Sequence, residues 1–299
     1  MSSLFAARDY RRPSDRVERQ LNWCTGCKYG RLDGQFTPGE VASFYPLEYY
    51  THGNGLHGEV KASFLDRLRA HLAWRFDQGT PLRPSEIVLE SEDQKLTFCD
   101  LGCGAGMQLG RFRKAGYQVI GVEPDPAARA LAQSVGEVLD GTAESIPSKV
   151  ADMRFNVVLM SRVLEHCIDP MKALANVWHI LEPIGTLVIE VPNNDALGFS
   201  KFGPIWPWTD IPRHLNFFTE RSLRAALWAS GFSVTQVNYV GYARQFQSEW
   251  IRTQELMHAQ IGSPPQPNFR RAAWMLLFRT AWAPAGTKYD SLRVHAHRR

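Results

Sequence analysis

Two acidic residues and a group of glycines form the pattern in this chain that is best suited to bind a ligand. Asp100 directly follows the β-compatible run 96–99, and Glu123 ends the next apolar run, 119–122. Glycine lets the backbone turn tightly and approach a ligand closely, and a carboxylate at a strand tip can accept two hydrogen bonds from a ribose diol. The glycines between the two acids are Gly102, Gly104 and Gly106. The pattern predicts a strand–turn–helix–strand unit that binds a nucleoside.

The spacing of these glycines narrows the choice of ligand. A dinucleotide fingerprint needs its third glycine at position 107, where this chain has Met107. The acid at position 100 would repel a pyrophosphate and attract an ammonium group. A nucleoside with a zwitterionic tail therefore fits better than a diphosphate, and S-adenosylmethionine is such a molecule.

Residues 95–240 resemble the class I S-adenosylmethionine-dependent methyltransferases. Besides the glycine turn, segment 139–147 is similar to the stretch that wraps the adenine, 155–166 to the fourth strand with its turn, and 181–193 to the fifth strand. The resemblance implies S-adenosyl-L-methionine as the cofactor and a defined set of cofactor-binding residues. These are Asp100, Gly102, Gly104, Gly106, Glu123, Thr142, Ala143 and Ser161.

Strands and helices are expected to alternate along most of the chain, which is typical of a parallel sheet covered on both faces. Strands are predicted near 96–101, 118–123, 154–161, 185–192, 232–240 and 289–297. Helices are predicted near 107–116, 126–136, 170–182 and 219–230, and over 244–283 with an interruption near 262–267. With the resemblance, this order implies an α/β fold: a Rossmann-like, doubly wound, mostly parallel seven-stranded sheet with an N-terminal arm and a C-terminal helical insertion.

Composition divides the chain into four stretches. We expect an irregular N-terminal arm with a degenerate cysteine knuckle over 1–58, and an amphipathic helix with a linker over 59–94. The S-adenosylmethionine-binding catalytic core spans 95–243, with a substrate loop at 193–218, and a helical insertion and closing strand occupy 244–299. The amphipathic helix is predicted from apolar residues at helical spacing. These are Val60, Phe64, Leu65, Leu68, Leu72 and Phe76.

The loop 193–218 is rich in aromatic residues and follows the carboxyl end of a predicted strand, where open α/β sheets place their ligand crevice. His214 is the candidate general base, since imidazole titrates near neutral pH; a structural role in shaping the loop is an equal alternative. The segment Pro-Arg-His-Leu at 212–215 resembles a methyltransferase subgroup linked to bacterial sugar, polysaccharide or secondary-metabolite modification. The expected substrate contacts are Arg213, Phe202, Trp206, Trp208 and Tyr49, the last as a lid residue.

His166 is a second, weaker catalytic candidate. It lies just after the fourth predicted strand, and a cofactor-pocket or structural role suits it better than substrate chemistry. The pair Cys24 and Cys27 supplies only two of the four ligands of a structural zinc site. We therefore expect no metal and a cysteine knuckle that packs without one.

Charge and cysteine content exclude several classes of function. The net charge of +4 is mild and the crevice loop is aromatic rather than basic, so a nucleic-acid substrate is not expected. Five cysteines form no even disulfide framework, and no signal peptide is expected at the charged N-terminus, so we predict a cytoplasmic protein.

The basic, amphipathic segment 269–282 could make peripheral contact with a membrane, although packing on the domain or on a second subunit is the interpretation that we favour. The oligomeric state stays open.

These observations favour a methyltransferase that methylates an oxygen of a saccharide or small natural product. No Asn/Asp-Pro-Pro-aromatic motif follows the fourth predicted strand, which argues against methylation of adenine or glutamine amino groups. The alternative is a catalytically inactive binding or scaffold protein that keeps the fold, and cofactor binding separates the two.

Overall fold

The computed structural model describes residues 1–299 apart from 13, 46–61, 78–80, 88–95 and 262–266, and the chain forms two compact units. Unit 1 contains 1–80, 192–221 and 239–292, and unit 2 contains 81–191, 222–238 and 293–299. Both units are therefore built from segments that are distant in sequence, whereas the predicted stretches were contiguous. Tyr49 lies outside the described residues.

Unit 2 is built on a seven-stranded sheet with the order β10-β11-β8-β7-β4-β5-β6. Its strands are β4 (Thr97–Leu101), β5 (Gln118–Val122), β6 (Glu137–Leu139), β7 (Phe155–Ser161), β8 (Leu181–Pro192), β10 (Phe232–Val240) and β11 (Ser291–Arg298). The pairs β4/β5, β4/β7, β5/β6 and β7/β8 are parallel. This confirms the predicted Rossmann-like sheet. The short β6 was not among the predicted ranges. Of the strands that were, β8 differs most, because Leu181 already pairs with Phe155.

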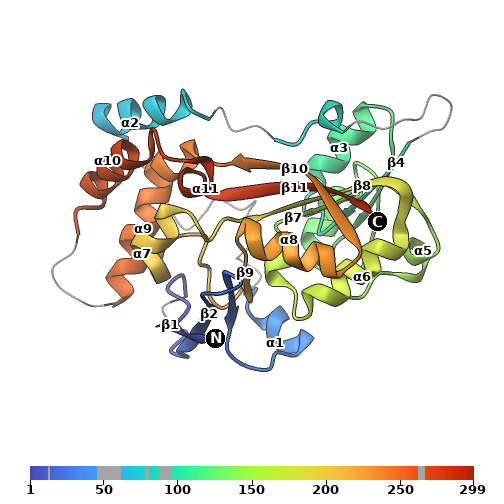
Figure 1. Cartoon of the computed structure of the whole chain (residues 1–299), viewed down its shortest axis with the longest axis horizontal. Helices are drawn as coiled ribbons and strands as arrows, with labels where there is room; N and C mark the ends of the chain where they lie inside the picture. The colour runs from blue at the N-terminus through green and yellow to red at the C-terminus, as the bar shows by residue number, and fades with distance from the viewer. Residues whose placement is uncertain (13, 46–61, 78–80, 88–95, 262–266) are drawn as a thin grey trace. The chain divides into compact units, whose positions relative to one another are not determined.

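Helices cover the sheet of unit 2, with α3 on one side and α6 and α8 on the other (Figure 1). The helices are α3 (Met107–Lys114), α4 (Pro126–Ala132), α5 (Ser148–Ala151), α6 (Pro170–Ile180) and α8 (Glu220–Ala229). Two of them begin with the sequence Asp-Pro: Asp125 accepts a hydrogen bond from Ala128 N, and Asp169 from Met171 N and Lys172 N. The acid caps the first turn and the proline fixes its φ, so the sequence itself sets where each strand–helix connection ends.

Burial of a histidine on β11 is expected to make the stability of the protein sensitive to acid. Burial is the main cause that lowers the pKa of His295 to about 4, and the charges of Arg293 and His297 add to the effect. Between this value and the ordinary value of about 6.5, the unfolded chain binds more protons than the folded one. The free energy of unfolding should therefore fall by about 3 kcal/mol as the pH drops from 7 to 4.

Urea denaturation across this pH range would measure the effect. In His295→Phe the titrating group is gone, so this part of the pH dependence should vanish. His179→Phe, at an exposed position of α6, should keep it. An unchanged slope in His295→Phe would contradict the assignment.

Unit 1 contains a four-stranded sheet with the order β1-β2-β3-β9. The strands are β1 (Ser2–Ala7), β2 (Arg19–Cys24), β3 (Tyr29–Leu32) and β9 (Asn216–Phe217), and each neighbouring pair is antiparallel. The expectation of an irregular arm was wrong for these residues. Alternate positions such as Leu21 and Leu32 are buried while their neighbours are not, but the strands are too short for this alternation to stand out in the sequence.

The helices of unit 1 are α1 (Pro38–Ser43), α2 (Phe64–Trp74), α7 (Leu197–Phe202), α9 (Ser248–Ile261), α10 (Phe269–Thr280) and α11 (Ala285–Lys288). An amphipathic helix normally buries its apolar stripe, but α2 buries Asp66, Arg69 and Ala73. Phe64 and Leu65 are 71% and 59% exposed. The helix is therefore present where it was predicted, with a polar face packed inward because an internal ion pair forms there. None of the described helices has the length and hydropathy needed to cross a bilayer.

Candidate functional site

Two buried carboxylates lie at the carboxyl edge of the sheet in unit 2. Asp100 lies in β4, and Glu123 directly follows the adjacent β5, so the parallel register brings both to the same edge. The Glu123 carboxylate accepts hydrogen bonds from Gly104 N (2.8 Å) and Asp125 N (2.9 Å). These two backbone donors fix the orientation of the carboxylate, and each carboxylate oxygen has a further lone pair that can accept from a ribose hydroxyl.

The electrostatics of this pair favour a positively charged ligand. Burial raises the pKa of Asp100 well above its ordinary value, and the nearby charge of Glu123 raises it further. Burial is also the main cause that raises the pKa of Glu123. Two acids that repel each other in a buried setting are relieved by a nearby cation. The ammonium and sulfonium groups of S-adenosylmethionine supply such charge, so the donor set fits this cofactor.

The glycine turn between the two acids requires glycine for geometric reasons. Gly102, Gly104 and Gly106 all have positive φ, at 72°, 54° and 82°. A Cβ built on Gly102 would lie 2.5 Å from Cγ2 of Val163. The backbone therefore carries no side chains at these three positions beside the two carboxylates, so a nucleoside can approach it closely.

Replacing Gly102 with alanine should weaken both the fold and cofactor binding. The variant combines a strained positive φ with a clash against Val163, and each effect costs about 1 kcal/mol or more. We expect a lower melting temperature and a weaker affinity for S-adenosylhomocysteine by calorimetry. Gly116→Ala is the matched control, because Gly116 also has a positive φ but a Cβ there meets no atom within 4 Å. A larger loss of stability or affinity in Gly102→Ala than in Gly116→Ala therefore measures the clash with Val163.

The remaining cofactor candidates lie at the same edge of the sheet. Thr142 and Ala143 belong to the loop after β6, and Ser161 is the last residue of β7. The loop is closed by Thr142 Oγ1, which accepts from Ser145 N at 3.0 Å, and by Asn176 Nδ2, which donates to Ala143 O at 2.9 Å. Because parallel strands end at one edge, the structure brings these residues to the same side as Asp100 and Glu123.

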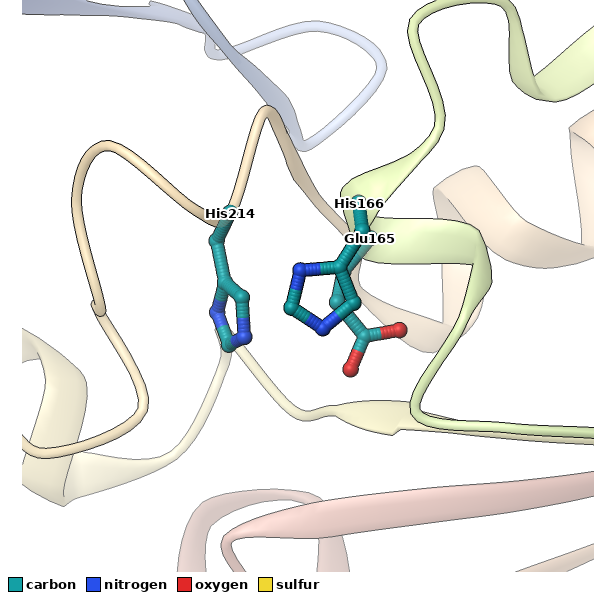
Figure 2. A group of neighbouring side chains, drawn as sticks. All are labelled: Glu165, His166 and His214. Atoms are coloured by element: carbon teal, nitrogen blue, oxygen red, sulfur yellow. The ribbon is translucent and has the colours of Figure 1, made fainter. Parts of the chain in front are cut away.

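Glu165 and His166 form part of the short 3-10 helix Leu164–His166 that follows β7 in unit 2 (Figure 2). Glu165 is fully buried, and this burial is the main cause that raises its pKa. His166 is partly exposed, and its backbone N donates to Val163 O at 3.0 Å. The carboxyl of Glu165 thus lies inside the protein, while His166 lies at its surface.

His214 lies in unit 1, in the loop before β9 (Figure 2), and is 3% exposed. Its Nδ1 lies 2.8 Å from the carbonyl oxygen of Trp208. A carbonyl oxygen only accepts, so Nδ1 carries the proton that is donated to Trp208. In the neutral ring the lone pair is then on Nε2, which is the nitrogen that could take a proton from a hydroxyl group.

Arg213, next to this histidine, is held by a buried ion-pair network. Its guanidinium donates to Asp9 at 2.6 and 2.9 Å, to Asp210 at 2.9 and 3.1 Å, and to Phe44 O at 3.2 Å. Burial alone would raise the pKa of Asp210, but Arg11, Arg213 and His214 outweigh it and lower that pKa far below its ordinary value. The sequence did not point to Asp9 as a partner, because 204 residues separate it from Arg213. The network fixes the loop that carries His214.

The aromatic residues of the predicted substrate loop differ in exposure. Trp206 is fully buried, and its ring centroid lies 5.8 Å from that of Phe199. Phe202 and Trp208 keep some exposed surface, and the guanidinium carbon of Arg244 lies 5.1 Å from the ring of Trp208. Trp206 therefore serves as core of unit 1, while Phe202 and Trp208 could still contact a substrate.

Cys24 is the last residue of β2, and Cys27 lies in the hairpin turn that leads to β3; both are free thiols. Cys27 N donates to Cys24 Sγ at 3.4 Å, and hydrogen bonds from Cys27 are the main cause that lowers the pKa of Cys24. A metal-free knuckle stays a prediction.

Comparison with known proteins identifies the family. The methyltransferase domain family matches residues 69–237, more than half of the chain. The chain is 30% identical over 190 residues to the ubiquinone biosynthesis O-methyltransferase of Cereibacter sphaeroides (strain ATCC 17025 / ATH 2.4.3), covering 59% of this chain and 73% of that protein. A protein of the same name from Azorhizobium caulinodans is 29% identical over 155 residues, covering 48% of this chain and 60% of that one.

Among solved structures, an S-adenosylmethionine-dependent methyltransferase from Mesorhizobium loti aligns with a TM-score of 0.46 and 17% identity, covering 70% of this chain and 93% of that one. The family match, the parallel sheet and the pair of acids at its edge lead to the same conclusion. The chain belongs to the methyltransferase domain family and is an S-adenosylmethionine-dependent methyltransferase with a Rossmann-like fold.

Proposed function

We propose that this enzyme transfers the methyl group of S-adenosylmethionine to a hydroxyl oxygen of a small acceptor, a saccharide or another natural product. The observation that carries the proposal is the hydrogen bond from His214 Nδ1 to Trp208 O, which leaves Nε2 as the basic nitrogen of the neutral ring. A hydroxyl nucleophile needs such a base, because its proton must leave as the new carbon–oxygen bond forms. The relatives named as O-methyltransferases support the same chemistry.

The roles of the other residues follow from their contacts. Glu123, oriented by Gly104 N and Asp125 N, accepts hydrogen bonds from the ribose hydroxyls. Asp100 attracts the ammonium group, and the glycine turn lets the nucleoside approach the backbone. Thr142, Ala143 and Ser161 complete the cofactor-binding edge.

When bound, S-adenosylmethionine supplies an electrophilic methyl carbon, so the protein mainly has to align the acceptor and exclude water. His214 Nε2 takes the proton of the acceptor hydroxyl. Arg213 is a positioning residue, because its guanidinium is bound within the protein and holds the loop of His214. His166 and Glu165 support the turn after β7.

The class of acceptor is proposed from two sources. The name of the relatives refers to ubiquinone biosynthesis, which supports a hydroxyl on a small natural product. The Pro-Arg-His-Leu segment at 212–215 supports a saccharide. Phe202 and Trp208, as partly exposed aromatic residues, suit the apolar face of either kind of ring.

Methyl transfer from labelled S-adenosylmethionine to a panel of phenols, catechols and saccharides tests this proposal. We expect turnover with at least one hydroxyl compound, and NMR of the product should place the methyl carbon on oxygen. Transfer to nitrogen or carbon, or cofactor binding without turnover on any hydroxyl acceptor, would argue against it.

A further inference from the structure

A polar cavity of about 260 Å³ lies within unit 1, among residues of α2, α9 and α10. Helix α10 contacts both α2 and α9, and Figure 1 shows it beside both. Three arginines line the cavity, Arg69, Arg252 and Arg270, together with the acids Asp66 and Glu255. None of these residues has a role in the proposed methyl transfer.

Arg69 is the central residue of this cavity, since it is fully buried. Its Nε donates to Phe246 O at 3.2 Å, and its Nη2 lies 2.9 Å from Asp66 Oδ1. Its Nη1 is buried and has no hydrogen-bond partner among the described residues. Buried donors are nearly always satisfied in folded proteins, so this nitrogen calls for an acceptor that the protein itself does not supply.

The charges around the cavity favour an anion as that acceptor. Asp66 is occupied by Ser63, which donates from both N (3.1 Å) and Oγ (2.7 Å), by Arg69 at 2.9 Å and, more weakly, by Arg270 at 3.5 Å. Arg252 pairs with Glu255 at 3.3 Å, yet the side chains of Arg252 and Arg270 are 49% and 55% exposed. Three guanidinium groups against two carboxylates leave net positive charge, and the two exposed arginines can turn toward a ligand.

We propose that this cavity binds a phosphate group. Arg69 would donate from the buried wall, while Arg252 and Arg270 would donate from the open side. Guanidinium groups match phosphate through paired N–H donors, and a tetrahedral phosphate offers acceptors to all three arginines at once. The volume holds a phosphate group together with several water molecules.

The phosphate could belong to a soluble compound or to a phospholipid headgroup. The two helices that contribute Arg69 and Arg270 also expose large apolar side chains, which makes the second source worth testing. Phe64 and Leu65 of α2 are 71% and 59% exposed, and Phe278 of α10 is 64% exposed.

Calorimetric titration of the intact protein with inorganic phosphate, at constant ionic strength, tests the site. We expect saturable binding that Arg252→Gln/Arg270→Gln weakens at least about tenfold, a change of 1.4 kcal/mol. The control is Arg67→Gln/Arg271→Gln, which removes the same charge from exposed positions of α2 and α10 that do not line the cavity. Binding that does not saturate, or that both double variants weaken equally, would show general charge attraction only and overturn the proposal.

Vesicle flotation then identifies the source. Phosphate-free buffer is used with vesicles of phosphatidylcholine, with and without phosphatidylglycerol. Loss of binding to the anionic vesicles in Arg252→Gln/Arg270→Gln, together with competition by inorganic phosphate, would assign a headgroup. Saturable phosphate binding with no vesicle binding would assign a soluble phosphate compound. Vesicle binding that neither the double variant nor phosphate reduces, in a protein that does not bind phosphate, would contradict the site.

Discussion

Glu123→Ala is expected to weaken binding of S-adenosylmethionine by at least about 100-fold. The variant loses two charge-assisted hydrogen bonds to the ribose hydroxyls, each worth about 1.5–3 kcal/mol, and every 1.4 kcal/mol is a factor of ten. It also removes half of the negative charge that attracts the cationic groups of the cofactor. Calorimetry with S-adenosylhomocysteine and with S-adenosylmethionine measures both contributions, because the first ligand lacks the sulfonium charge.

The fold should tolerate this change. Glu123→Ala leaves Gly104 N and Asp125 N without their acceptor, but it also removes a buried charge beside Asp100. Glu137→Ala is the matched control, because Glu137 lies in the neighbouring β6 with an exposed side chain paired with Lys149. A Glu123→Ala protein that is folded by thermal denaturation and binds the cofactor as tightly as Glu137→Ala would refute the assigned role.

His214→Asn is expected to lower kcat by about 100-fold or more while cofactor affinity stays unchanged. The asparagine amide can occupy the position of Nδ1 and still donate to Trp208 O, so the loop keeps its hydrogen bond. The atom lost is Nε2, the proposed base. His214→Gln keeps a polar atom near the position of Nε2 but has no basicity, so it should be similarly slow.

The pH–rate profile separates a catalytic from a structural role. A general base makes the wild-type rate rise with pH as the imidazole loses its proton, and both variants should lose this dependence. His179→Asn, at an exposed position of α6, should keep the wild-type profile. Full turnover in His214→Asn with an unchanged profile would mean that the histidine only shapes its loop.

The position of α2 shows how local pattern and packing can disagree. Its helical spacing was readable, but the stripe with the most apolar residues faces outward, while Asp66 and Arg69 face inward. The reason is that Arg69 finds Asp66 one turn away and Phe246 O far along the chain. The helical pattern includes Asp66, which lies three residues before Arg69. It cannot include Phe246, which is 177 residues away in the chain.

Arg213, the neighbour of the candidate base His214, likewise has partners that the local sequence does not reveal. As a charged residue in an aromatic loop it resembled a substrate contact, yet its guanidinium is bound by Asp9 and Asp210 inside unit 1. No periodicity links positions 9 and 213, so only the folded chain reveals that this arginine positions the loop. The tautomer of His214 could not be predicted from the sequence either, because it depends on the hydrogen bond to the carbonyl oxygen of Trp208.

The cofactor-binding edge of unit 2 could be predicted from local sequence patterns. Asp100, the glycine turn and Glu123 lie in one short segment, and parallel strands with Asp-Pro helix starts follow local rules of spacing and capping. In contrast, the assembly of unit 1 from three separate segments, the charges that it buries and the position of the cavity beside Arg69 are visible only in the folded chain. Such features arise from contacts between residues far apart in the chain, and the cost of burying a charge is set only when those partners meet.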